Sequence, residues 1–173
     1  MPRLILRRLD ADDARAIVRL LDALDVARTT ASIPHPCRAE HAERWIAGSD
    51  ELGPARAITA DGRLIGVISF NPVTDGATEI GYWLGQPFWG QGFIREAVDA
   101  MIAAAFQQGS ARRITAQVFD DNPASARVLE RCGFDRVGRG TGASVARGRR
   151  DIPETHFACT RDSWHTRHEG CAA

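Results

Sequence analysis

A glycine-rich turn between a strand pattern and a helix pattern constrains the fold of this chain more than any other feature. Residues 78–84 (TEIGYWL) have the branched and aromatic composition of a strand, and residues 94–105 repeat apolar side chains at helical spacing. Between them lies Trp89–Gly92, with sequence WGQG. The first amides of a helix have no intrahelical partner, the helix dipole puts partial positive charge there, and glycine lets a phosphate approach closely. The pattern predicts either a site for a phosphate-bearing ligand or a tight turn that binds nothing.

Two familiar phosphate-binding loops do not match this turn. The Gly-Lys-Ser/Thr tripeptide of a Walker loop is absent from the sequence. A dinucleotide fingerprint requires a third glycine at the position of Arg95, and it requires a strand–helix unit near the start of the chain. What remains is a diphosphate held by backbone amides, with little help from side-chain charge.

The order of strand and helix patterns predicts a mixed sheet. Two early strands are joined by Asp61-Gly62, a dipeptide typical of two-residue hairpins, and later strands alternate with helices. Residues 138–150, rich in glycine and arginine, are expected to form a flexible connection. The fold class is therefore α/β or α+β, in one domain spanning residues 1–173 with no internal repeat. The expected strands are residues 4–9, 55–59, 64–70, 78–84, 114–119, 134–137 and 155–160; the expected helices are residues 14–24, one beginning near residue 38, residues 94–105, and one capped by Asn122 and closed by Gly133.

Charge and cysteine content exclude several classes of protein. Lys plus Arg and Asp plus Glu each number 22, so the formal net charge is zero, which argues against direct nucleic-acid binding. No apolar run approaches the roughly 20 residues that span a bilayer, and arginines interrupt the N-terminus where a signal peptide needs apolar residues. We therefore expect a cytoplasmic protein with no membrane partner. The cysteines, Cys37, Cys132, Cys159 and Cys171, lack zinc-ligand spacing, so no metal is expected, and Cys132 and Cys159 are predicted to be core thiols.

Two motifs resemble those of the GNAT N-acetyltransferase superfamily. Residues 79–84 (EIGYWL) with residues 89–93 (WGQGF) resemble its acetyl-CoA-binding motif, and residues 122–134 (NPASARVLERCGF) resemble the motif that follows it. Both are most similar to the RimJ/RimL branch, and the likeness extends from residues 34–36 (PHP) to residues 160–164 (TRDSW), nearly the whole chain. The resemblance implies a GNAT-type, mostly antiparallel central sheet that is flanked by helices and splayed at the acetyl-CoA site.

The resemblance also implies which residues hold acetyl-CoA as co-substrate. The backbone of Trp83 and Leu84 would pair with the pantetheine arm, and one of these amides would polarise the thioester carbonyl. The side chain of Asn122 would contact the arm as well as cap a helix. Two positions depart from the family pattern: Pro87 has no amide hydrogen, and Gln91 stands where a lysine is common. The amides that would hold the pyrophosphate are those of Trp89, Gly90, Gln91, Gly92, Phe93 and Ile94.

Acetyl transfer to an amine is helped by a general base, because an α-amino group has a pKa near 8 and is largely protonated at neutral pH. Glu79 is the first candidate, since related enzymes often place a carboxylate on this strand; the alternative is that Glu79 orders a loop or pairs with an arginine. His35, in a proline-rich loop, is the second candidate for the base, although a substrate-lining or exposed position is the stronger expectation for it.

The leaving thiolate of acetyl transfer needs a proton. Many superfamily members use a tyrosine at the position of Leu129, and the one tyrosine of this chain is Tyr82. The RimL-like alternative is a serine three residues after the asparagine, which matches Ser125. Glu79 and Ser125 are therefore the predicted catalytic residues.

The resemblance implies acetyl transfer to a primary amine by direct attack in a ternary complex. The acceptor is a protein N-terminus, as in members that act on ribosomal proteins, or a small-molecule amine. The missing tyrosine and Pro87 motivate the alternative of a non-catalytic acetyl-CoA-binding regulatory module, and Ser125 and Glu79 count against it. A homodimer stays open, because dimers are common in the family and no apolar stripe requires one. The basic cluster of Arg147, Arg149 and Arg150 is expected to lie in a solvated loop.

Overall fold

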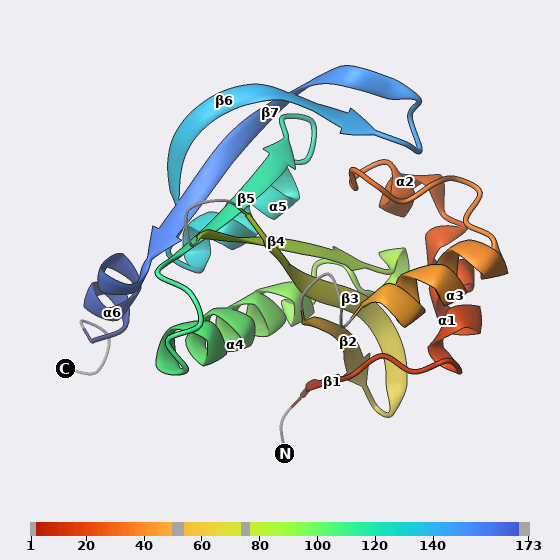
Figure 1. Ribbon diagram of the computed structural model, residues 1–173, viewed down its shortest axis with the longest axis horizontal. Coiled ribbons are helices and arrows are strands. Elements are labelled where there is room, and N and C mark those ends of the chain that lie inside the picture. The colour runs from red at the N-terminus through yellow and green to blue at the C-terminus, as the bar shows by residue number, and fades with distance from the viewer. Residues whose placement is uncertain (1–2, 50–53, 74–76, 170–173) are drawn as a thin grey trace.

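The computed structural model describes residues 3–49, 54–73 and 77–169 (Figure 1). The helices and strands occur in the order β1 (Ile5–Arg7), α1 (Asp13–Leu21), α2 (Leu24–Ala27), α3 (Ala39–Gly48), β2 (Ala55–Ala60), β3 (Arg63–Pro72), β4 (Ala77–Leu84), the 3-10 helix η2 (Gln86–Phe88), α4 (Phe93–Gln107), β5 (Arg113–Phe119), α5 (Pro123–Arg131), β6 (Asp135–Ser144), β7 (Arg149–Thr160) and α6 (Arg161–Glu169).

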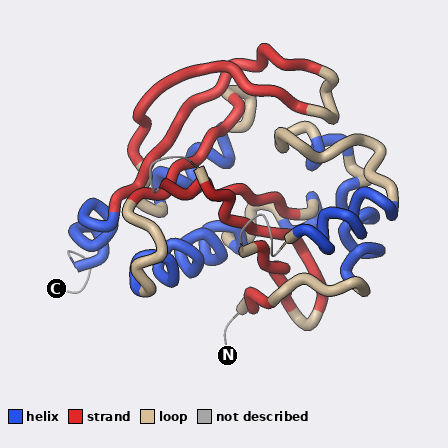
Figure 2. The backbone as a smooth tube through the Cα atoms, in the orientation of Figure 1, coloured by secondary structure: helices blue, strands red, loops and turns tan. Residues whose placement is uncertain are grey.

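Within the described residues, seven strands form one sheet in the order β1-β2-β3-β4-β5-β7-β6. All neighbouring strands are antiparallel except β4 and β5, which are parallel. This parallel pair meets over three positions, Ala77–Glu79 against Arg113–Thr115. Beyond these positions β4 runs across the view while β5 turns upward beneath the β6–β7 hairpin (Figures 1 and 2). The mixed, mostly antiparallel sheet confirms the predicted fold class.

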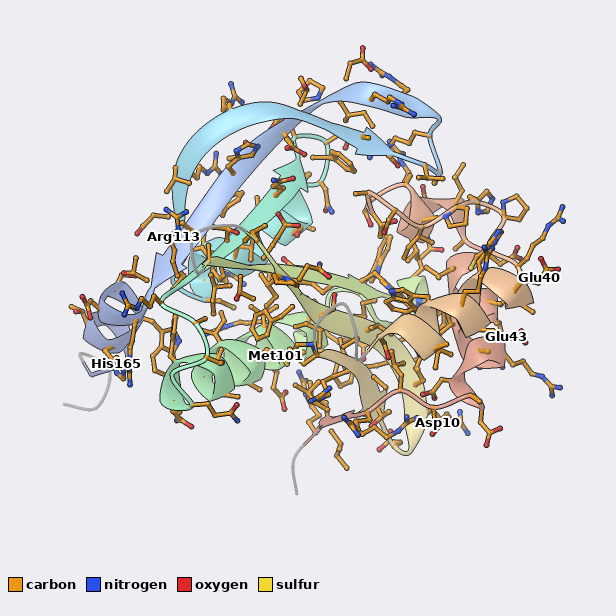
Figure 3. All side chains as sticks on the ribbon, in the orientation of Figure 1. Asp10, Glu40, Glu43, Met101, Arg113 and His165 are labelled. Atoms are coloured by element: carbon orange, nitrogen blue, oxygen red, sulfur yellow. The ribbon has the colours of Figure 1, made fainter. Side chains whose placement is uncertain are left out.

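The sheet has a core on each face. On one face α1 and α3 pack against β2, β3 and β4, and on the other face α4 and α5 pack against β3, β4 and β5. Met101 of α4 lies between that helix and the sheet, whereas Glu40 and Glu43 lie on the exposed side of α3 (Figure 3). The first core includes Ile17, Leu21, Ala42, Val67 and Trp83, and the second includes Ile68, Ile80, Val98, Ile102, Ile114 and Leu129.

Local sequence signals account for the conformation of two connections. Asp61 and Gly62 both have positive φ, 49° and 73°, as a type I′ hairpin turn requires. At the start of α5 the side chain of Asn122 accepts a hydrogen bond from the amide of Ser125 at 3.3 Å, with Pro123 at the first helical position. Both predicted features are therefore confirmed.

The prediction of a flexible connection over residues 138–150 was wrong. Most of this segment belongs to β6 and β7, which pair over their length as a long hairpin that arches over the molecule (Figure 1). Gly138, Gly140 and Gly142 alternate along β6, and glycine is depleted in strands, so the segment lacked a strand signal. The alternation leaves space for the side chains of Glu154 and His156 on β7.

Smaller differences occur at both ends of the chain. Leu24 does not extend the apolar face of α1: that helix ends at Leu21, and Leu24 begins α2 with 49 % of its surface exposed. The expected first strand shortens to β1, and α6 was not predicted, because its hydrophobic periodicity is weak. A single large apolar side chain anchors α6, since Trp164 packs against Phe106 with ring centroids 5.9 Å apart.

Cys37, Cys132 and Cys159 are buried free thiols, and Cys171 lies outside the described residues. Among the helices that the structure describes, none has the length and apolar character needed to cross a membrane. In the same part of the chain, no cluster of three or more His, Cys, Asp or Glu side chains is arranged to hold a metal ion.

The expectation that Arg147 lies in a solvated loop was also wrong. Its guanidinium forms two hydrogen bonds to Asp121, at 2.8 and 3.0 Å, and one to the carbonyl of Arg28 at 2.7 Å. It also lies 4.9 Å from the ring centroid of Phe119, and 15 % of its side chain is exposed. Arg147 therefore fastens the tip of the β6–β7 hairpin to the segment after α2. Arg149 and Arg150, by contrast, are exposed as expected, although they begin β7 and do not lie in a loop.

We expect Arg147→Ala to lower the free energy of unfolding at pH 7 by about 1–2 kcal/mol, because it removes charged hydrogen bonds that are only partly screened by solvent. The pKa of Asp121 is lowered by the hydrogen bond from Arg147, against an opposing effect of burial. This carboxylate therefore stabilises the fold above its unfolded pKa of about 4, and the stabilisation is lost as pH falls through the lower folded value.

Urea denaturation at pH 7 and at pH 3 measures both effects. The wild-type advantage over Arg147→Ala should shrink at pH 3, and Arg149→Ala should change stability by less than about 0.5 kcal/mol at either pH. Equal stability of wild type and Arg147→Ala at pH 7 would contradict a fastening role.

Candidate active site

A cleft of about 1100 Å³ lies where the pairing of β4 and β5 ends. Its lining includes Glu79 and Tyr82 from β4, Gln117 from β5 and Ser125 from α5, so residues of both strands face the same space. The cleft extends from the N-terminus of α4 to the face of the sheet covered by α1 and α3. It therefore joins two chemically different ends.

The first end is the predicted anion-binding turn. Gly90 and Gly92 have φ values of 71° and 81°, in the left-handed region that favours glycine, and Gly92 caps α4 without any side-chain hydrogen bond. The amide of Glu96 donates to the carbonyl of Gly92, so the amides of the three residues before it precede the first hydrogen bond of the helix. A side chain at Gly90 would meet nothing, so this part of the turn is open to a ligand.

Two side-chain contacts hold the turn against the end of β4. The indole Nε1 of Trp89 donates to the carbonyl of Leu84 at 2.7 Å, and Nε2 of Gln91 donates to the carbonyl of Pro87 at 3.0 Å. Pro87 sits in η2, where its missing amide hydrogen leaves this turn intact. The side chains of Trp89 and Gln91 thus shape the turn, which leaves ligand binding to the backbone amides.

Three arginines line the cleft near this end, and sequence reasoning missed them. Arg95 follows the turn on α4, and Arg127 and Arg131 lie one helical turn apart on α5. Arg127 and Arg131 are exposed and have no ion-pair partner among the described residues. Their i, i+4 spacing in the second motif was the available signal. The three side chains place positive charge on the lining of a cleft whose glycine-rich turn has the neutral Gln91.

Ser125 is paired with Tyr82 across the cleft. Their hydroxyl oxygens lie 2.7 Å apart, and Tyr82 is half-buried on β4. Burial raises the pKa of the Tyr82 phenol far above its ordinary value, while the hydrogen bond with Ser125 lowers it in part. Tyr82 therefore stays a neutral hydroxyl that can donate to Ser125. The sequence placed a tyrosine on the motif strand but not its contact with the serine.

Glu79 is half-buried on β4 and faces the cleft. It lies at the last position where β4 pairs with β5, opposite Thr115, and it has no hydrogen-bond or ion-pair partner among the described residues. Burial and the charge of Glu154 raise its pKa, and His156 opposes this effect. The alternative that Glu79 pairs with an arginine has no support in the described part of the chain.

The backbones of Trp83 and Leu84 face opposite directions. The amide of Gly85 donates to the carbonyl of Ile65 on β3, and alternation along the strand turns Trp83 toward β3 as well. A side chain at Gly66 of β3 would collide with the Trp83 carbonyl, which agrees with this direction. Leu84 therefore directs its backbone toward the opening between β4 and β5, and its carbonyl already accepts from Trp89.

The second end of the cleft, against α3 and the loop before it, has an apolar wall. Ile33, Pro34, Cys37 and Trp45 line it, together with Trp83. His35 is half-buried in the same loop but is not among the lining residues, so the structure does not bring it together with Glu79 and Ser125. Of the predicted site residues, His35 and Gln91 are thus the two that do not line the cleft.

Comparison with known sequences identifies the family. A sequence model described as an acetyltransferase (GNAT) domain matches residues 3–135. The chain therefore belongs to the GNAT acetyltransferase family, the class of acetyl-CoA-dependent N-acetyltransferases that its motifs resemble.

Each curated relative matches about half of the chain. The ribosomal-protein-serine acetyltransferase of Escherichia coli K12 is 43 % identical over 79 residues, 44 % of either chain. The putative ribosomal N-acetyltransferase YdaF of Bacillus subtilis is 32 % identical over 93 residues, 53 % of this chain and 51 % of its own. The chain thus matches about half the length of these relatives.

Solved structures show the same fold over nearly the whole chain. RimL, a ribosomal L7/L12 α-N-protein acetyltransferase in complex with coenzyme A, aligns with a TM-score of 0.82 at 24 % identity, over 94 % of this chain and 97 % of its own. Spermidine N-acetyltransferase from Vibrio cholerae, in complex with CoA and spermine, aligns with a TM-score of 0.79 at 18 % identity, over 94 % and 98 %. The predicted GNAT fold is confirmed.

Proposed function

We propose that this protein transfers the acetyl group of acetyl-CoA to a primary amine by direct attack in a ternary complex. The observation that carries the proposal is that one cleft joins the N-terminus of α4, the Ser125–Tyr82 hydroxyl pair and Glu79. Membership of the GNAT family supports it, as do the coenzyme A ligands named for proteins of the same fold.

Acetyl-CoA is proposed to occupy the arginine-rich end of the cleft. The amides of residues 89–94 receive the pyrophosphate, and the positive charges of Arg95, Arg127 and Arg131 on the lining of the same cleft favour a negatively charged ligand. The pantetheine arm lies in the opening between β4 and β5, where Asn122 contacts it. The Leu84 amide, which faces this opening, is the donor proposed to polarise the thioester carbonyl; Trp83 supports the strand from the β3 side.

Glu79 is proposed as the general base. The attacking amine must lose a proton, and a carboxylate whose pKa is raised toward neutrality accepts that proton more readily than an ordinary one. Its carboxylate has no partner among the described residues, so it is available to the acceptor or to a bridging water.

Ser125 is proposed to protonate the leaving thiolate. As the nitrogen–carbon bond forms and the carbon–sulfur bond breaks, negative charge develops on sulfur, and the serine hydroxyl donates its proton there. Ser125 then regains a proton from solvent, and Glu79 releases to solvent the proton that it took from the amine. The two hydroxyl oxygens lie 2.7 Å apart, and the proposed mechanism takes Tyr82 as the donor, which leaves the serine proton free to point at the sulfur. In the overall reaction one proton leaves the nitrogen and one reaches the sulfur.

A thiol in the cleft offers a covalent route, which we disfavour. Cys37 lines the second end of the cleft, which we call the acceptor end because the acceptor amine is proposed to enter there. Burial raises the pKa of this thiol, which lowers the fraction of reactive thiolate. Cys132 is fully buried in the core, as predicted. Neither thiol is therefore well suited to carry an acetyl group.

The acceptor is proposed to be a protein N-terminal amine or a small-molecule amine. The first follows the name of the Escherichia coli relative at 43 % identity, and the second follows the spermidine enzyme of similar fold. CoA release with a panel of peptides, amino acids, polyamines and aminoglycosides, followed by mass spectrometry of the products, tests the proposal. Acceptor-dependent release with an acetylated amine product is the expected result. Tight acetyl-CoA binding without release for any acceptor would instead indicate the non-catalytic module.

We expect Tyr82→Phe to lower kcat by roughly 3- to 10-fold, because loss of one neutral hydrogen bond is worth about 1 kcal/mol. The affinity for acetyl-CoA should stay within about twofold, since Tyr82 reaches the cofactor through Ser125. Steady-state kinetics with the best panel acceptor and isothermal titration with acetyl-CoA measure the two effects. An unchanged kcat would show that Tyr82 does not orient Ser125.

A further inference from the structure

Glu154 on β7 lines the same cleft as Glu79, and its neighbour His156 lies on the same face of the sheet. Strand register places Glu154 opposite Phe119 and His156 opposite Gln117, and directly opposed residues share a face of a sheet. Gln117 is two residues beyond Thr115, the partner of Glu79, so all three titratable side chains lie on one face. Glu154 lines the cleft itself, and its charge acts on Glu79.

The carboxylate of Glu154 is buried with unused hydrogen-bonding capacity. Only 5 % of the residue is exposed, and Oε1 receives one hydrogen bond, from Nε2 of His156 at 2.9 Å. A carboxylate has about four acceptor positions, and burying it costs free energy unless a cation or further donors satisfy it. No second donor to Glu154 is present among the described residues.

The facing strand makes room for this pair. A side chain at Gly142 would collide with the Glu154 carboxylate, and one at Gly140 would press on the imidazole of His156 at 2.9 Å. The alternating glycines of β6 thus leave the space that the Glu154–His156 pair occupies. This explains why glycine recurs at every second position of β6.

The lining of the cleft carries charges of both signs. Arg95, Arg127 and Arg131 line the cofactor end, whereas Glu79 and Glu154 are the acidic side chains among its described lining residues. His41 and Arg44 of α3 also line the cleft. Arg147 does not line it, and its guanidinium stacks on the ring of Phe119. An acceptor that carries a positive charge next to an apolar group matches the two carboxylates and the apolar wall of Trp83, Ile33 and Cys37.

We propose that Glu154 binds the ammonium group of the acceptor before Glu79 removes its proton, and that His156 positions the Glu154 carboxylate. This inference rests on the proposed acetyl transfer and specifies its acceptor: a protonated primary amine attached to a small or apolar group. A polyamine, with several charges, exceeds what two carboxylates can neutralise.

Glu154→Gln tests the inference with a pair of probes. One is the panel acceptor with the highest kcat/KM, and the other is the same molecule with a hydroxyl in place of the amine, such as a lactyl peptide for a peptide that begins with alanine. The wild type should bind the amine more tightly than the alcohol, measured as acceptor KM and as inhibition by the alcohol. Glu130→Gln, which removes an exposed carboxylate outside the cleft, is the matched control.

We expect Glu154→Gln to raise the acceptor KM roughly 10- to 100-fold, because the ammonium group loses one charged hydrogen bond. Alcohol inhibition, kcat and the Kd of acetyl-CoA should each stay within about threefold. His156→Gln should raise the acceptor KM less, because a donor to Glu154 remains.

Two outcomes would overturn the inference. An acceptor KM within twofold of wild type excludes Glu154 from amine binding, and an equal weakening of amine and alcohol indicates a merely structural role. Both leave acetyl transfer intact, whereas a wild type that releases no CoA with any acceptor refutes the proposed function itself.

Discussion

Replacing Ser125 by alanine is expected to lower kcat by roughly 100-fold, while acetyl-CoA binds with nearly unchanged Kd. General acid catalysis typically contributes 10²- to 10⁴-fold, and the lower end suits a serine, whose hydroxyl is a weak acid. Binding should persist because the pyrophosphate site proposed at the N-terminus of α4 is separate from Ser125. Steady-state kinetics and isothermal titration separate the two effects.

The Tyr82 contact gives this prediction a second readout. If the two hydroxyls act as a unit, the double variant Ser125→Ala/Tyr82→Phe should be no slower than Ser125→Ala alone. Ser110→Ala, which removes an exposed hydroxyl at the end of α4, is the matched control and should keep wild-type turnover. Wild-type turnover in Ser125→Ala would remove this serine from the mechanism.

The second large effect is expected for Glu79→Gln, with a roughly 100-fold loss of kcat/KM at pH 7 that narrows as pH rises. At neutral pH the amine is mostly protonated and depends on the base; above its pKa of about 8 it deprotonates without help. The deficit should therefore fall below about 10-fold at pH 9 for an N-terminal amine. Glu130→Gln again serves as the control for loss of a carboxylate.

The direction of the pKa shift of Glu79 determines how the activity of the wild type depends on pH. Because burial and Glu154 raise the pKa of Glu79, the ionised base accumulates at a higher pH than for an exposed glutamate, and activity should rise with pH through that raised value. Removing the negative charge with Glu154→Gln should shift this rise to lower pH. A Glu79→Gln deficit that is constant from pH 6 to pH 9 would falsify its assignment as the base.

The features predictable from sequence are those fixed by short-range chemistry. The turn at Gly90 and Gly92, the cap at Asn122 and the Asp61-Gly62 hairpin each depend on residues within a few positions, so their patterns indicated the right conformation. The family motifs then added Glu79 and Ser125, and the structure brings both to one cleft.

What could not be predicted depends on contacts between distant segments. Tyr82 and Ser125 are 43 residues apart, and Arg147 reaches back 119 residues to Arg28, so no local pattern connects them. The glycines of β6 had the composition of a flexible loop, because their reason lies in the side chains of Glu154 and His156 on the next strand. A single-sequence pattern contains the glycines but not the partner that requires them.

Initial rates with both substrates varied test the central claim of direct transfer most directly. We predict intersecting double-reciprocal lines, with no acetylated protein detected by mass spectrometry when acetyl-CoA is present without acceptor. Parallel lines together with an acetylated cysteine, abolished in Cys37→Ser, would contradict direct attack and assign a covalent route instead.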